Sequence, residues 1–113
     1  MTRFVVFVLA GLLFPALPAF AGDPVAGDPA AGEDMALRLC SGCHAVMPGE
    51  ASRVAQAPPF SDFAAKWPLD YLSEALAEGI VTGHSGIEMP EFRFEPDEID
   101  DLIAFLAAIQ NEK

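Results

Sequence analysis

Five consecutive residues near the middle of the chain combine two thiols with an imidazole. The segment Cys40-Ser41-Gly42-Cys43-His44 places its thiols at positions i and i+3 and its imidazole at i+4. Because residues three and four apart share one side of a helical turn, all three groups can act on one ligand. Thiols and an imidazole at this spacing can form a disulfide, exchange disulfides, bind a metal ion or attach a porphyrin.

Attachment of haem agrees best with the rest of the sequence. C-x-x-C-H is the signature of c-type haem, in which each thiol forms a thioether with a vinyl group and the imidazole binds the iron. A thioredoxin-like pair normally accompanies a βαβ pattern, which this sequence lacks, and zinc would need further ligands, of which only His84 is left. A disulfide between Cys40 and Cys43 stays an alternative, since an exported chain meets oxidants. We therefore predict one covalently bound haem c, with His44 as the proximal iron ligand.

Three segments have helical patterns, and together they predict an all-α domain. The first begins at Glu33, where acidic residues suit a first helical turn, and runs into the cysteine motif. The second spans 68–79, from a proline to a glycine, and the third spans 96–110, with an acidic first turn and a wide apolar stripe. The segments 45–59 and 79–94 between them are predicted to be long loops.

The N-terminus has the pattern of an export signal. Arg3 provides a basic start, 4–14 is an apolar run, and Ala19-Phe20-Ala21 has the small-x-small form of a cleavage site. The alternative is an uncleaved membrane anchor, but the segment contains two prolines and lacks stop-transfer charges. We expect residues 1–21 to be a signal peptide that is cleaved after Ala21, which releases the mature chain into the periplasm.

The mature chain has room for one small domain. Residues 22–32 contain Gly-Asp-Pro twice, each time after an alanine, and are expected to form a flexible leader, followed by the domain at 33–113. The chain of 113 residues is 52% apolar with a net charge of −11, and removal of the apolar signal leaves it smaller and more acidic. A core of this size is marginal, so a cofactor is expected to complete it. The acidity excludes a nucleic-acid binder, because phosphate affinity comes mainly from lysine and arginine.

Beyond the haem motif, the sequence resembles the class I monohaem cytochrome c family over about residues 32–110. Gly32 and Ala36 stand eight and four residues before Cys40, where the family packs its N-terminal helix against its C-terminal helix. The other side of that crossing is matched by Leu102, Phe105 and Leu106. The resemblance implies the small cytochrome c fold, with three main helices and long loops wrapped around one covalent haem.

The resemblance also implies roles for residues around the haem. In the family a proline carbonyl accepts the Nδ1–H of the proximal histidine, which we assign to Pro58, and a methionine followed by proline supplies the sixth iron ligand, which matches Met89. Trp67 is expected either to donate a hydrogen bond to a haem propionate or to pack without one. Five phenylalanines are expected to line the haem crevice: Phe60, Phe63, Phe92, Phe94 and Phe105.

Other residues compete with Met89 for the sixth position. Met47 lies only three residues after His44, on the proximal side, and Met35 is expected to fill the core. His84 is the main rival, because it precedes Met89 by five residues on the same loop. We expect His84 to bond a propionate or solvent instead, and an iron with an open sixth position is the third option.

These assignments imply a soluble electron carrier, with no small-molecule substrate, whose iron alternates between ferric and ferrous with His44 and Met89 as ligands. The acidic charge predicts transient docking to a redox protein with a basic docking face. On the second helix Asp70, Glu74 and Glu78 form an acidic ridge, which is either a solvated face or such a docking surface. Two alternatives remain: a haem subunit of a larger periplasmic dehydrogenase or oxidase complex, and an open-site haem enzyme or gas sensor. The redox partner can also be a membrane-bound respiratory complex.

Overall fold

The protein is described here by a computed structural model that covers residues 26–79, 83–84 and 87–110. Its helices follow the all-α prediction and are α1 (Pro29–Leu39), a 3-10 turn η1 (Phe60–Asp62), α2 (Phe63–Lys66), α3 (Leu69–Glu78) and α4 (Pro96–Ile109). Two short strands, β1 (Gly83–His84) and β2 (Ile87–Glu88), pair antiparallel within the loop between α3 and α4. The predicted signal peptide lies outside the described residues. None of the helices in these ranges has the length and apolarity needed to span a bilayer.

Helix α1 begins at Pro29 rather than at Glu33, so the prediction of a leader up to residue 32 is wrong for its last four residues. Asp28 is the N-cap, and its side chain accepts a hydrogen bond from the backbone N–H of Ala30 at 2.9 Å. Proline at the first helical position loses no hydrogen bond there, which favours this start. The second Ala-Gly-Asp-Pro copy is therefore a helix-capping signal and not part of a linker.

The main contact of the fold is the crossing of α1 over α4. Gly32 of α1 lies directly against the backbone carbonyl of Asp101, and a methyl group there would meet that oxygen and, at 2.9 Å, the Cβ of Phe105. Ala36, one turn further on, is fully buried at the same crossing. The chain is also tied to α4 before the helix starts, because the N–H of Asp28 donates to Asp101 Oδ1 at 2.6 Å.

Helices α3 and α4 pack side by side and complete the core. Helix α4 starts with a capping box between Glu95 and Glu98 and buries a wide apolar stripe. Helix α3 is bounded by Pro68 and Gly79, as expected, and contributes Leu76 to the core. The acidic ridge of α3 lies on its exposed side and consists of Asp70, Glu74 and Glu78.

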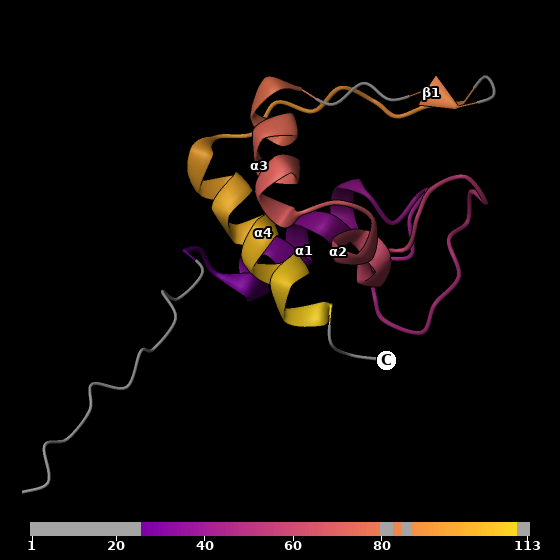
Figure 1. Ribbon diagram of the computed structural model, residues 1–113, viewed down its shortest axis with the longest axis horizontal. Coiled ribbons are helices and arrows are strands. Elements are labelled where there is room, and N and C mark those ends of the chain that lie inside the picture. Colours follow the sequence, from indigo (N-terminus) through magenta and orange to yellow (C-terminus); the bar gives the residue numbers. More distant parts are fainter. Residues whose placement is uncertain (1–25, 80–82, 85–86, 111–113) are drawn as a thin grey trace, which may run out of the picture.

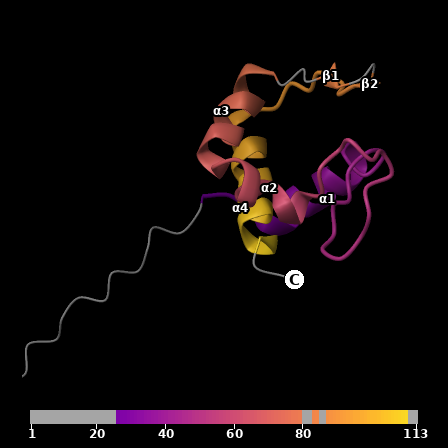
Figure 2. The same ribbon diagram turned by 45° about the vertical axis from the view of Figure 1, so that its right-hand side comes forward.

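The long loops leave the helices on one side of the molecule. The connection from α3 to α4 carries β1 and β2 and is called the arm below. Figures 1 and 2 both place the 40–59 loop and this arm on the same side of α3 and α4. Helix α2 lies near the base of the 40–59 loop in both views. The segments that contain the predicted haem residues therefore come together beside the helices.

Replacing Gly32 with Ala is expected to destabilise the haem-bound protein by about 3 kcal/mol, because the neighbouring backbone carbonyl cannot rotate away from the new methyl group. Guanidinium unfolding followed by circular dichroism measures the change. Ala31→Ser is the matched control, since it enlarges the neighbouring side chain of the same helix at an exposed position. Equal stability of the two variants would show that α1 and α4 do not depend on this close approach.

Candidate haem site

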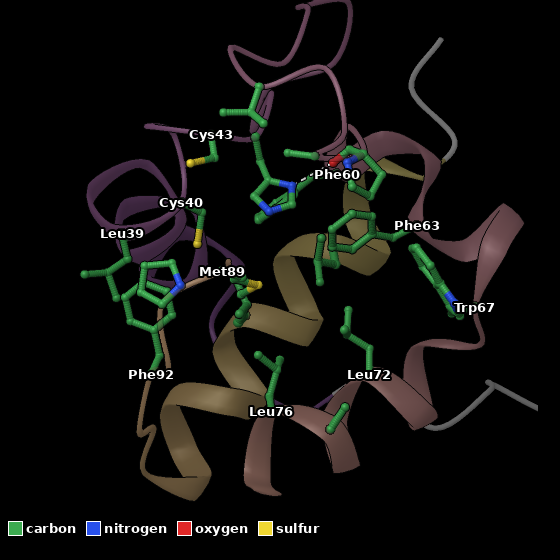
Figure 3. A pocket seen from close by; sticks show the side chains of 18 of the residues that line it. Leu39, Cys40, Cys43, Phe60, Phe63, Trp67, Leu72, Leu76, Met89 and Phe92 are labelled. Carbon is green, nitrogen blue, oxygen red and sulfur yellow. Dashed lines mark hydrogen bonds between the residues drawn. The ribbon is translucent and has the colours of Figure 1, made fainter. Parts of the chain in front are cut away.

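The structure contains a cavity of about 670 Å³ between the 40–59 loop, helices α2 to α4 and the arm (Figure 3). The volume lies within the range of sites that hold small molecules and cofactors. All six residues that the sequence assigned to the haem line this cavity: Cys40, Cys43, His44, Pro58, Trp67 and Met89. In Figure 3 the two cysteines lie at one side of the cavity and Trp67 at the opposite side.

The C-x-x-C-H motif forms a tight turn at the end of α1. Cys40 is the C-cap of the helix, and its carbonyl accepts hydrogen bonds from the N–H of Cys43 at 3.1 Å and of His44 at 2.9 Å. These bonds continue the helical path for one more turn, so that both thiols and the imidazole contribute to one wall of the cavity.

Cys40 and Cys43 are free thiols, and no disulfide joins them in the structure. Burial, and to a smaller extent the neighbouring Cys43, raises the pKa of Cys40 to about 11. Cys40 therefore stays protonated at neutral pH. The two thiols are half-buried and open onto the same cavity, which suits covalent attachment of a ligand placed inside it.

A backbone carbonyl orients the imidazole of His44. The Nδ1 atom lies 2.8 Å from the carbonyl oxygen of Pro58, the proline that the resemblance selected. Because a carbonyl oxygen can only accept, Nδ1 carries the proton, which leaves the lone pair of Nε2 available to a metal ion. The ring is also held by Phe60 and Phe63, whose centroids lie 5.2 and 5.9 Å from its own.

The 40–59 loop is held in place by hydrogen bonds that the sequence did not predict. The N–H of Ala45 donates to Ser52 Oγ at 2.9 Å, and the carbonyl of Ala45 accepts from the N–H of Phe60 at 2.9 Å. The side chain of the next residue, Val46, is almost fully buried in the core. A serine in a loop carries no pattern that would mark it, so Ser52 could be found only in the folded chain.

The aromatic lining differs from the prediction at one position. Phe60, Phe63, Phe92 and Phe94 line the cavity as expected, but the lining residues do not include Phe105. Its side chain is buried at the crossing of α1 and α4, against Gly32. Helix α4 instead presents Leu102 and Leu106 to the cavity.

The arm brings Met89 to the cavity, where it is half-buried. The competing methionines lie elsewhere, since Met35 is buried in the core and Met47 packs against it outside the cavity lining. The backbone of His84 pairs with that of Ile87 in the two-stranded ladder. The side chain of His84 lies outside what the structure describes, so its predicted role stays a prediction.

Trp67 lies at the edge of the cavity with 46% of its surface exposed. Its ring packs edge-on against Phe63 at a centroid distance of 5.9 Å, and Lys66 Nζ lies 5.9 Å from the centre of the indole. The residue thus has both an apolar contact inside the site and access to solvent. This position fits either role that the sequence left open.

Comparisons with known proteins agree with this site. The family model described as Cytochrome c matches residues 29–110. A curated relative, cytochrome c-552 of Bradyrhizobium diazoefficiens, is 30% identical over 95 residues, which cover 84% of this chain and 88% of the relative. No solved structure matches the chain significantly.

Proposed function

Because the chain belongs to the cytochrome c family of haem-containing electron-transfer proteins, we propose that it is an exported one-electron carrier with His44 and Met89 as its iron ligands. The cavity is the observation that carries this proposal. It joins the two thiols and the imidazole at the end of α1 to a thioether on the distant arm, within one mainly apolar space. A covalent haem c with histidine and methionine as iron ligands needs this combination of groups.

The residues present fit a covalent haem. Cys40 and Cys43 would hold it through thioethers, and both are free thiols at the cavity wall. His44 would bind the iron through Nε2, because its Nδ1–H is engaged by Pro58. Such a bond to the far ring nitrogen fixes the orientation of a ligating histidine and increases its basicity.

The apolar lining determines the environment of the redox centre. Haem c, when bound, supplies one-electron chemistry between ferric and ferrous iron. Phe60, Phe63, Leu102 and Leu106 keep water from the interior of the cavity. Met89 contributes a neutral thioether, and both a dry site and this ligand favour the ferrous state. With His44 and Met89 as its ligands, a bound haem would leave no position for a substrate and would serve electron transfer alone.

We propose that the redox partner docks through a basic face. Asp70, Glu74 and Glu78 are exposed on α3, while Tyr71, Leu72, Ala75 and Leu76 of the same helix line the cavity. A cationic partner drawn to the ridge would therefore arrive next to the redox centre. Charges at such a surface increase the rate of encounter more than the affinity, which suits a transient electron-transfer complex.

Export and haem attachment can be tested on the protein recovered from the periplasm. We expect its mass under denaturing conditions to equal that of residues 22–113 plus one haem, because thioether formation is an addition without loss of atoms. An optical redox titration of the same sample should show one one-electron transition. A mass that includes residues 1–21, or loss of haem on denaturation, would contradict the proposal.

Replacing Met89 with Ala is expected to abolish the methionine–iron charge-transfer band of the ferric protein, because the thioether is removed from the cavity. Met47→Ala is the matched control and should keep the band, since Met47 lies outside the cavity lining. Persistence of the band in the Met89 variant would show that another residue is the ligand. Rapid carbon monoxide binding to the reduced wild-type protein would favour an open-site enzyme or sensor.

Electron transfer to a cationic cobalt(III) complex should slow as salt rises, because screening weakens the attraction to an acidic surface. Neutralising the ridge with Asp70→Asn, Glu74→Gln and Glu78→Gln should flatten the salt dependence. Neutralising Glu50, Asp97 and Asp100 is the control, as it removes the same charge from exposed residues outside the cavity lining. A salt-independent rate for the wild-type protein, or an equal effect of the two triple variants, would exclude the ridge as the docking surface.

A further inference from the structure

The side chain of Gln110, at the C-cap of α4, bridges this helix to the segment 60–64. Its Oε1 accepts a hydrogen bond from the backbone N–H of Ala64 at 2.8 Å. Its Nε2 donates to the carbonyl of Phe60 at 2.8 Å and to that of Leu106, in its own helix, at 2.9 Å. One half-buried amide therefore makes three hydrogen bonds, two of them to a segment about fifty residues away in the sequence.

Only an amide can make this set of bonds. The group must accept from one N–H and donate to two carbonyl oxygens, so a reversed amide would set an oxygen against both carbonyls. A glutamate at 110 would keep the acceptor but lose both donors when ionised. A methionine would keep the length of the side chain and lose all three hydrogen bonds.

Besides Gln110, the bond from the N–H of Phe60 to the carbonyl of Ala45 and the burial of the Phe60 and Phe63 rings hold this segment, but its helix has weak local support. Helix α2 is only four residues long, and its N-cap Asp62 makes no side-chain capping hydrogen bond. Gln110 therefore satisfies the N–H of Ala64 in the first turn of this helix, where intrahelical partners are missing. A short helix of this kind depends on tertiary contacts for its position.

This segment and Pro58, two residues before it, together orient His44. The carbonyl of Pro58 binds its Nδ1–H, and the rings of Phe60 and Phe63 pack against the imidazole. Phe60 is thus bonded to Gln110 through its carbonyl and contacts His44 through its ring. A shift of this segment would move the hydrogen-bond acceptor and both ring contacts of the histidine together.

We propose that Gln110 is a positioning residue for His44: it holds the segment 58–64 against α4 and thereby keeps the imidazole in the orientation that binds iron. The inference rests on the proposed role of His44 as an axial ligand. Gln110 is not among the residues that line the cavity, and we assign it no contact with the haem. Its effect on the redox centre is transmitted through Phe60 and Pro58.

The test is the hydrogen-exchange rate of the His44 Nδ1–H, measured by NMR on the haem-bound wild-type protein and its variants. In Gln110→Glu and Gln110→Met, we expect this proton to exchange at least about ten-fold faster, because loss of the bridge favours local opening of the segment. The backbone amides of Phe60 and Ala64 should exchange faster as well. The exchange rates of buried amides in α1 and α4 should change much less.

Ala108→Glu is the matched control for the glutamate variant. It adds a negative charge to the same end of α4 at an exposed position, so it should lower stability through the helix dipole without accelerating exchange at His44. Gln110→Met carries no added charge and tests the bridge alone.

Two outcomes would overturn the inference. Exchange of the His44 proton at the wild-type rate in both Gln110 variants would show that the segment holds its position without the amide. Faster exchange in equal proportion at His44, α1 and α4 would show that Gln110 contributes only to global stability. Whether His44 binds iron is read separately, from the paramagnetic shifts of its ring protons in the ferric wild-type protein. Absence of those shifts would refute the ligand assignment, whatever the exchange rates.

Discussion

The close approach of α1 to α4 at Gly32 positions the other elements of the fold. It lets the backbone of one helix lie on the backbone of the other, with Ala36 and Phe105 closing the crossing on either side. Because Cys40 caps α1, the crossing also decides where the thiols lie relative to Leu102 and Leu106 on α4. The same helix pair therefore determines the positions of the two cysteines and of the apolar residues that α4 contributes to the cavity.

The size of the domain explains why a covalent cofactor suits this fold. Four helices, one of them a single turn, bury a core that is small for a chain with two long loops. The cavity lies next to this core and shares Phe60, Phe63, Leu76 and other apolar residues with it. A flat apolar ligand in the cavity would extend the core and give the arm a surface to pack on. Covalent attachment keeps that contribution permanent.

The histidine site shows how a loop can be held as firmly as a helix. The bond between His44 Nδ1 and Pro58 O joins residues fourteen positions apart. A bond from Ala45 to Ser52 subdivides the loop between them, and a second bond from Ala45 reaches Phe60, just beyond the loop. Gln110 then connects the end of the loop to α4. Each of these bonds uses a backbone group as a partner, so the orientation of the imidazole depends on the path of the chain more than on the types of side chain around it.

Features that depend on neighbouring residues could be predicted from the sequence. C-x-x-C-H marked the cofactor, the proline and glycine boundaries marked α3 within one residue, and the apolar stripe marked α4. The resemblance to known cytochromes selected Pro58 and Met89, which the folded chain brings into the same cavity. The start of α1 at Asp28 and Pro29 became evident in the folded chain, where Asp101 on α4 reinforces the capping. Only the structure separated Phe105, which faces α1, from Leu102 and Leu106, which face the cavity. The apolar stripe of α4 faces both α1 and the cavity. Which of the two a residue of the stripe contacts depends on where α1 lies.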